Sequence, residues 1–280
     1  LYAKWEAGKD TAYRVEHYFQ NADGSYPDAA SQTENLTGTT GTQVTPAVKS
    51  YTGFTAPATQ AVTIAADGST TVTYQYTRNT YEITYTYTSD SGTPGAAKVS
   101  EKYEAKVKLA GNLGTPIGYT LNGWTTEDVA VENGMFTMPA KDVTFTADYT
   151  ANEYGITYTG MDGAEYGTDH PTKHTYGSET VISDPTKVGY TFTGWLVNNS
   201  TTAVKNLTLG AKDYTANITL KATWTANTYT VTLETNGGTI NAGTVESYTY
   251  GEGATLPTNV TKTGYTFGGW YDNEAFNGTA

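Results

Sequence analysis

Histidine is the side chain best suited to acid–base or metal chemistry here, and two of the three histidines share one segment, Asp169-His-Pro-Thr-Lys-His174. Histidines four residues apart can bind one metal ion when the segment is helical. Pro171 disfavours a helix, because proline lacks the backbone N–H. We therefore expect a solvated loop without metal or catalysis. An enzyme that depends on His170 or His174 is the alternative.

The remaining titratable groups also lack the spacing of a site. His17 lies in the strand-like segment Tyr13-Arg-Val-Glu-His-Tyr18, where it shares a face with Tyr13 and Val15, and we expect it to be half-buried. The acidic groupings do not have the spaced carboxylates and central glycine of a calcium loop. They are Glu127-Asp128, Asp272-Asn-Glu274 and Asn21-Ala-Asp23. The sequence predicts no catalytic, cofactor-binding or metal-binding residues, and no cofactor.

Composition narrows the classes of protein further. The chain has 280 residues, no cysteine, 28 acidic and 16 basic residues. Disulfides and thiol chemistry are excluded, and the acidic balance argues against a nucleic-acid partner, which needs a basic surface. Apolar runs are too short for a membrane span. Abundant Thr and Tyr, with many glycines, predict a mostly β protein.

Repetition is the strongest signal in the sequence. A seven-residue landmark occurs as Gly118-Tyr-Thr-Leu-Asn-Gly-Trp124, Gly189-Tyr-Thr-Phe-Thr-Gly-Trp195 and Gly264-Tyr-Thr-Phe-Gly-Gly-Trp270, with a weaker form at Ser50-Tyr-Thr-Gly-Phe54. First strands begin at Tyr13, Tyr81, Tyr154 and Tyr229, and closing strands end at Trp5, Tyr76, Tyr149 and Trp224. All three series step by about 70 to 75 residues, which indicates tandem modules.

The landmarks divide the chain into modules joined by short polar segments. Residues 1–9 are read as the closing strand of a preceding module or of a module in a neighbouring molecule. The first, second and third modules are residues 10–78, 79–151 and 152–226, and the fourth, 227–280, lacks a closing strand. The joints are a few residues long, which predicts neighbouring modules in contact along an elongated rod.

Large aromatic residues must supply much of each core, because modules of this size have little interior volume. The internal glycine of the landmark is expected to bend its strand or to permit a close backbone approach. The predicted core anchors are Trp5, Trp124, Trp195, Trp224, Trp270, Tyr119, Tyr190, Tyr265, Phe192 and Phe267. An exposed tryptophan that stacks on carbohydrate is the alternative reading of the landmark tryptophans.

Residues 152–280 resemble the Listeria–Bacteroides repeat, the internalin B-repeat of bacterial surface proteins, through Tyr229-Thr-Val-Thr-Leu-Glu-Thr-Asn-Gly-Gly238 and the landmark that follows it. Residues 79–151 match less closely, with Leu121 in place of Phe. Residues 10–78 are similar to mucin-binding-protein repeats and lack the tryptophan. The resemblance implies β-grasp-like modules in extracellular, secreted or cell-wall proteins.

Three functions follow as hypotheses. The first is a structural stalk of a cell-surface protein that projects an adhesive or other domain. The second is an adhesin that binds a host glycoprotein or glycan. The third is a self-assembling fibre, in which Leu1, Tyr2, Ala3, Lys4 and Trp5 complete the fourth module of another copy head to tail.

Overall fold

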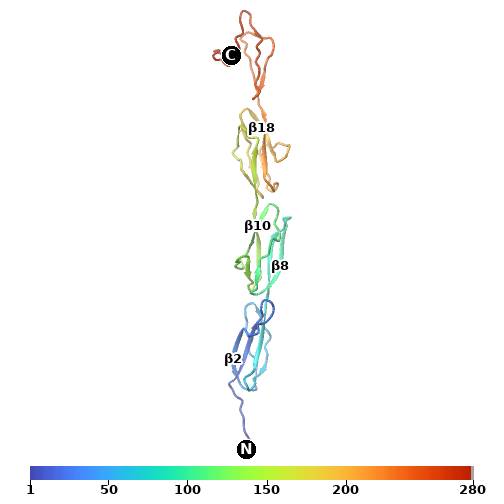
Figure 1. Cartoon of the computed structure of the whole chain (residues 1–280), viewed down its shortest axis with the longest axis vertical. Coiled ribbons are helices and arrows are strands. Elements are labelled where there is room, and N and C mark those ends of the chain that lie inside the picture. Colours follow the sequence, from blue (N-terminus) through green and yellow to red (C-terminus); the bar gives the residue numbers. More distant parts are fainter. Residues whose placement is uncertain (279–280) are drawn as a thin grey trace. The chain divides into compact units, whose positions relative to one another are not determined.

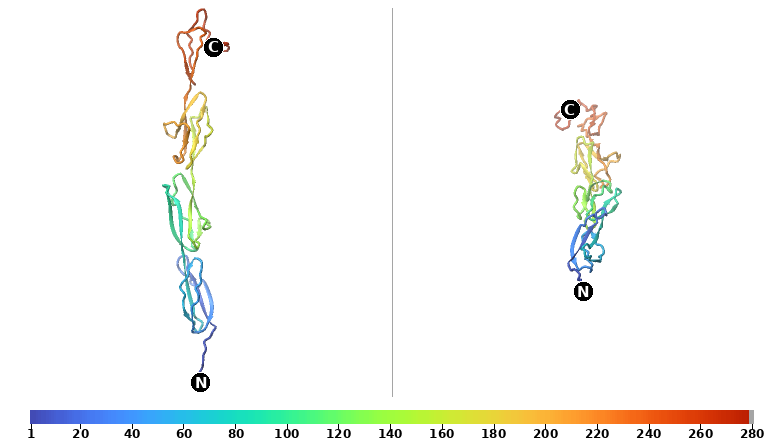
Figure 2. Two further views of the ribbon diagram at one scale, coloured as in Figure 1. Left: turned by 180° about the vertical axis from the view of Figure 1, so that it is seen from behind. Right: turned by 60° about the horizontal axis from the view of Figure 1, so that its bottom comes forward.

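The computed structural model describes residues 1–278 and contains only strands, turns and irregular segments over that range, with no helix (Figure 1). The prediction of an all-β fold is confirmed. The last two residues of the fourth module lie outside the described part. Contacts divide the chain into two compact units, Leu1–Thr150 and Ala151–Ala280. Figure 2 shows the chain in two further views.

The first module folds as a mixed four-stranded sheet of order β2-β1-β6-β4. The main strands are β1 (Thr11–Phe19), β2 (Gln32–Gly38), β4 (Phe54–Thr55) and β6 (Thr71–Arg78), and β3 (Gln43–Val44) pairs with β5 (Val62–Thr63). β1 and β6 are parallel neighbours in the centre of the sheet, and β2 and β4 pair antiparallel at its edges. A central parallel pair of first and last strands is the arrangement expected of a β-grasp-like module.

The second module repeats this order as β10-β12-β7-β8. Its strands are β7 (Thr80–Thr88), β8 (Pro94–Lys102), β10 (Tyr119–Thr125) and β12 (Val143–Ala151), with β9 (Lys106–Lys108) paired to β11 (Met135–Thr137). β7 and β12 are again parallel neighbours. The core of this module includes Tyr85, Phe136 and Phe145, which supply the aromatic burial that the sequence predicts.

The third module has the largest sheet, of order β14-β17-β18-β20-β13-β15. Its strands are β13 (Glu153–Thr159), β14 (Ala164–Glu165), β15 (Lys173–Thr175), β17 (Thr186–Lys187), β18 (Tyr190–Val197) and β20 (Ile218–Ala226), with β16 (Thr180–Ile182) paired to β19 (Leu207–Leu209). The register of β18 against β20 shifts between Phe192 and Gly194. This irregularity resets the alternation of the strand, so that Phe192 and Trp195, three residues apart, both enter the core.

The fourth module has two short antiparallel ladders and no parallel central pair within the described residues. β21 (Thr228–Thr230) pairs with β23 (Ser247–Thr249), and β22 (Thr239–Ile240) pairs with β24 (Val260–Thr261). The landmark Gly264–Trp270 contains no regular strand in this module. In the third module the same landmark forms β18, which pairs with the closing strand β20.

A single asparagine separates the closing strand of each module from the first strand of the next. β6 ends at Arg78 and β7 begins at Thr80; β20 ends at Ala226 and β21 begins at Thr228. Asn79 and Asn227 are therefore complete joints of one residue. The joints are shorter than the sequence predicts, because the strands extend through the polar residues on either side.

Candidate functional site

The structure separates the two neighbouring histidines. His170 is exposed in the loop before β15; its Nδ1 lies 3.0 Å from the Gly167 carbonyl oxygen, and its ring stacks on Tyr166 at 5.0 Å between centroids. His174 lies within β15 and is completely buried, with Nδ1 2.8 Å from Thr180 Oγ1. The segment is a loop followed by a strand, as Pro171 predicts, and the two rings do not converge. In residues 1–278 no group of three or more His, Asp or Glu side chains could hold a metal ion.

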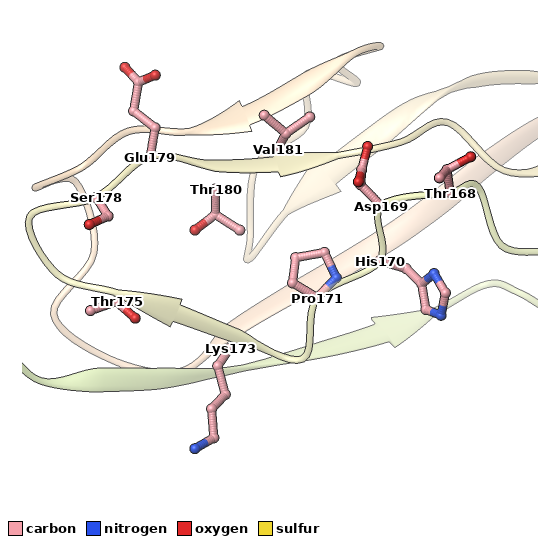
Figure 3. A pocket seen from close by; sticks show the side chains of 10 residues that line it. All are labelled: Thr168, Asp169, His170, Pro171, Lys173, Thr175, Ser178, Glu179, Thr180 and Val181. Atoms are coloured by element: carbon pink, nitrogen blue, oxygen red, sulfur yellow. The ribbon is translucent and has the colours of Figure 1, made fainter.

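A shallow hollow of about 660 Å³ lies beside this segment in the third module (Figure 3). Its lining is polar: Thr168, Asp169, His170, Pro171, Lys173, Thr175, Ser178, Glu179, Thr180 and Val181. Figure 3 shows the side chains of Lys173 and Glu179 projecting to opposite sides of the hollow. The charged groups therefore do not converge on a common point.

Several polar groups of the hollow are already bound within the module. Lys173 Nζ lies 2.6 Å from Glu153 Oε2, and the Asp169 carboxylate accepts a hydrogen bond from Ser183 at 3.1 Å. Thr180 Oγ1 is bonded to the buried His174. General acid–base catalysis needs a base within hydrogen-bond reach of a bound proton donor, and nucleophilic catalysis needs an activated nucleophile. The hollow offers hydroxyl groups for weak hydrogen bonding. Its lining does not place a base beside a bound proton donor or beside a nucleophile.

His17 belongs to a polar network inside the first module. Its Nε2 lies 2.7 Å from Glu34 Oε1 and its Nδ1 lies 3.0 Å from the Tyr76 hydroxyl, which accepts the Lys49 backbone N–H at 3.1 Å. His17 is 0% exposed, so the prediction of a half-buried histidine is corrected. The rings of Tyr51, Tyr74 and Tyr76 surround the imidazole at 5.6 to 6.1 Å, which explains the complete burial.

The same network fixes the charges at its outer end. Lys49 Nζ lies 2.9 Å from Glu34 Oε1. The hydrogen bond from Lys49, followed by that from His17, lowers the pKa of the Glu34 carboxyl, and the bond to Glu34 raises the pKa of the Lys49 amine. Glu34 is therefore ionised and accepts the Nε2–H of His17. No solvent reaches the imidazole, so this network stabilises the module and offers no access to a substrate.

The acidic groupings serve local structure. Asp128 accepts hydrogen bonds from Lys141 Nζ at 2.7 Å and from the Thr144 backbone N–H at 2.8 Å, and these bonds lower the pKa of its carboxyl. Asp23 accepts both the hydroxyl and the backbone N–H of Ser25, which lower its pKa in the same way. Asp23 is thus bonded within its own turn, and Asp128 is bonded to residues at and before the start of β12. Neither grouping is arranged to surround a cation.

The predicted core anchors fall into two groups. Trp195 is 1% exposed and Phe192 is also buried, and Trp224 packs against the same cluster. Trp124 packs against the core of the second module and donates its indole N–H to the Ala110 carbonyl at 2.9 Å. Trp270 donates to the Pro257 carbonyl at 2.7 Å and contacts Phe267 at 5.5 Å; both are partly buried.

The landmark tyrosines lie outside the hydrophobic cores. Tyr119 and Tyr190 are half-buried, and Tyr265 is 73% exposed beneath Lys262. Each follows a landmark glycine directly; Tyr119 and Tyr190 are the first residues of β10 and β18. Trp5 is 89% exposed, because residues 1–5 pair with no strand among the described residues. Tyr119, Tyr190 and Tyr265 are therefore not core residues in this structure, whereas the prediction for Trp5 concerns a module other than those described and stays a prediction.

Sequence reasoning missed the residues that connect neighbouring modules inside each unit. Tyr103 packs near Phe54, and Tyr250 packs near Tyr190, at 5.9 and 5.5 Å between ring centroids. A signal was available, because a tyrosine follows each joint asparagine after 23 or 24 residues, as in Asn79 and Tyr103. These connections are the repeated feature of the molecule with the most defined geometry.

Tandem β modules with separate cores define a repeat protein. Family models agree with this class. The Listeria–Bacteroides repeat domain matches residues 154–223 and 229–280, and the divergent InlB B-repeat domain matches residues 85–153. The chain belongs to this family of repeats. The similarity of residues 10–78 to mucin-binding-protein repeats stays a prediction.

Curated relatives share only parts of the chain. A glycine-rich protein of Evansella cellulosilytica that is named as a membrane protein is 32% identical over 169 residues, 56% of this chain and 18% of that protein. Internalin H of Listeria monocytogenes is 39% identical over 104 residues, 36% of this chain and 18% of that protein. The chain thus spans under a third of the length of these relatives.

A comparison with solved structures finds the TIE protein of Bacillus anthracis, with 10% identity and a TM-score of 0.36 over 78% of this chain and 51% of that chain. This similarity is too low to support an argument. The repeat family is one of surface or secreted proteins. Residues 1–278 contain no helix that is long and apolar enough to cross a membrane.

Proposed function

We propose that the chain is a stalk or spacer segment of a bacterial surface or secreted protein, whose modules are arranged as an elongated rod that projects an adhesive or other domain. The observation that carries the proposal is the repetition of one sheet order around separate cores in the first and second modules, extended by further strands in the third. Structure repeats along the chain, whereas no reactive constellation repeats with it.

Small-angle scattering of the whole chain tests this proposal. A compact globule of this length has a radius of gyration of about 19 Å, whereas four modules in line, each about 28 Å across, give about 33 Å. A value near 33 Å at several protein concentrations supports the spacer, with both values estimated from the same scaling. A value near 19 Å overturns it, because a clustered particle cannot provide reach.

Adhesion is a second candidate, favoured by the hydroxyl-lined hollow of the third module. The hydroxyls of Thr175 and Ser178 could hydrogen-bond a glycan of a host surface glycoprotein. A glycan array probed with the whole chain tests this role, with Ser178→Ala as the variant and Thr33→Ala, on the exposed edge of the first module, as its matched control. Binding that Ser178→Ala alone removes supports adhesion, and no signal above background rejects it.

Self-assembly is a third candidate, favoured by the complete exposure of Leu1, Tyr2 and Trp5. These residues carry the pattern of the closing strands at Phe145–Tyr149 and Leu220–Trp224, which lie within sheets. We propose that residues 1–5 can pair head to tail with the fourth module of another copy. Sedimentation velocity should then detect concentration-dependent assemblies that deletion of residues 1–5 abolishes. Assemblies that persist after the deletion contradict this model.

A further inference from the structure

The joint between the first and second modules is fixed by hydrogen bonds on both sides of one residue. The Asn79 N–H donates to the Gly53 carbonyl at 2.9 Å, and the Asn79 carbonyl accepts the Tyr103 N–H at 2.9 Å. The Asn79 side-chain Oδ1 also accepts the Thr55 hydroxyl at 2.6 Å. A residue between two modules thus bonds to the landmark segment of the preceding module and to the end of a hairpin in the following one.

The second compact unit contains the same arrangement with different residues. The Asn227 N–H donates to the Gly189 carbonyl at 2.9 Å, and its carbonyl accepts the Tyr250 N–H at 2.9 Å. The Asn227 Oδ1 accepts the Thr191 hydroxyl at 2.6 Å. The four positions correspond one to one with those of the first joint. Two independent joints with the same bonds indicate a built connection.

Each tyrosine ring occupies the space that a side chain on the landmark glycine would need. A Cβ placed on Gly53 would overlap the Tyr103 ring, and a Cβ placed on Gly189 would overlap the Tyr250 ring. The two glycines have φ of 79° and 76°, which other residues adopt with strain. Glycine therefore serves two purposes here: it turns the chain into the next strand and leaves a flat surface for the ring.

We propose that the landmark glycine and its two following residues form a docking surface for the tyrosine of the next module, and that the joint asparagine bridges the pair. The surface fixes the orientation of neighbouring modules within each compact unit. The partner is defined by chemistry: a tyrosine at the end of the first hairpin, 23 or 24 residues after the asparagine. In the third module, Tyr176 donates its N–H to the Asn152 carbonyl at 2.9 Å, which repeats the hairpin side of the connection.

The first joint carries an additional clamp. The Arg78 side chain is 12% exposed and donates to the carbonyls of Gln20 at 2.6 Å and Tyr103 at 2.7 Å, and to Glu104 Oε2 at 2.7 Å. Its guanidinium also lies 4.8 Å from the centre of the Phe54 ring, within the range of a cation–π contact. Arg78 thereby binds both modules at once, so the first joint should be the more rigid of the two.

The inference goes beyond the spacer proposal, because it concerns how adjacent modules are held whether or not the chain provides reach. Its test is independent of the scattering experiment. Since the chain contains no cysteine, two introduced cysteines carry spin labels at defined sites. The labelled positions are Asn35→Cys on β2 and Ser100→Cys on β8, which are both exposed. Pulsed electron–electron double resonance between the two labels reports the distance between the first and second modules.

The labelled chain is compared with three variants. Gly53→Ala blocks the docking surface and Tyr103→Ala removes the ring without changing the backbone of Gly53. Gly264→Ala is the matched control: Gly264 has φ of 82° at the same landmark position, and a Cβ there meets no described atom within 4 Å. It reproduces the backbone strain of Gly53→Ala without any tyrosine to displace.

We expect a single narrow distance distribution in the labelled parent chain and in Gly264→Ala. With Arg78→Ala present in the parent and in every variant, so that the clamp cannot hold the joint, the width in Gly53→Ala and Tyr103→Ala should increase about twofold or more over the parent, because a one-residue joint without docking keeps two soft dihedrals. Circular dichroism and amide exchange in β1 and β7 verify that both modules stay folded. The proposal is overturned if the distance distribution of Tyr103→Ala is as narrow as that of the parent. It is also overturned if the distribution of the parent is already as broad as those of the variants.

Discussion

The hydroxyl of Tyr76 holds the buried network of the first module together, so Tyr76→Phe is the most informative single change in that module. The ring is completely buried and phenylalanine preserves it. The substitution removes only the hydroxyl oxygen. In the native chain this oxygen accepts a hydrogen bond from the Lys49 backbone N–H at 3.1 Å and lies 3.0 Å from His17 Nδ1. The variant thus separates the network from the packing.

The expected cost follows from the exposure of the two former partners. Lys49 is exposed, so water can replace the hydroxyl at its N–H. His17 is buried, and its Nδ1 has no other partner among the described residues. One buried polar group without a partner costs about 1 to 3 kcal/mol. We expect the first module to lose that amount of stability.

Hydrogen exchange read by mass spectrometry is the appropriate assay, because several modules in one chain need not unfold in a single transition. Amides of β1 and β6 should exchange about 5- to 150-fold faster, since about 1.4 kcal/mol corresponds to tenfold. Amides of β13 and β20 should not change. Tyr13→Phe is the control, because the Tyr13 hydroxyl makes no hydrogen bond within residues 1–278 and should matter by less than about 0.5 kcal/mol.

Unchanged exchange of β1 and β6 in Tyr76→Phe would refute the reasoning, because it would mean that the imidazole does not need the hydroxyl. Equal acceleration in the third module would also refute it, since the effect would then not be local. An effect of the same size in Tyr13→Phe would mean that losing any tyrosine hydroxyl of this module is destabilising, and the loss could not be assigned to the network.

Three further changes test other parts of the chain. Trp195→Ala should cost the third module about 3 to 5 kcal/mol, seen as faster exchange in β18 and β20, and retained protection would contradict its role as an anchor. Burial raises the pKa of Tyr158 to about 12, so unfolding releases a proton between pH 10 and 12. The third module should therefore lose stability as the pH rises through that window. In thermal scans Tyr158→Phe should weaken this dependence and leave the part due to Tyr214, whose pKa burial also raises, and an unchanged dependence would contradict the assignment. The hydrogen bond from Lys141 lowers the pKa of the Asp128 carboxyl. The stability that this carboxylate contributes is therefore present above its pKa in the unfolded chain and is lost as the pH falls through its pKa in the folded chain. Asp128→Asn should flatten this acid dependence of amide exchange in β12, and an unchanged dependence would refute the assignment.

Sequence reasoning predicted the mostly β fold and the first strands because each depends on local pattern. Alternation places Val15 and His17 on the buried face of β1, as observed. The internal glycine of the landmark was expected to bend its strand or to permit a close backbone approach. At Gly194 in β18 the register shifts and the backbone of Val204 lies where a Cβ would stand. Local pattern does not specify where a residue lies along its sheet. Tyr190 and Tyr265 both fit a strand pattern, but Tyr190 is the first residue of β18 and Tyr265 lies outside the regular strands.

The joints were harder to predict because their contacts join residues far apart in the sequence. Gly53 and Tyr103 are separated by fifty positions, and only the folding of two modules brings them together. The same reason hid the full burial of His17, since Tyr76 reaches it through a parallel pairing that periodicity does not specify. The pairing of a one-residue joint with a tyrosine can be found by aligning the modules to each other.

The parallel pairing of first and last strands has a mechanical consequence. In the first three modules the chain enters through one of these strands and leaves through the other, and the two lie side by side in the same direction. A pull on both ends must slide the strands along each other, so that their hydrogen bonds are strained together and not opened one by one. We therefore expect tension to break the contacts at Asn79 and Asn227 before any of these modules unfolds.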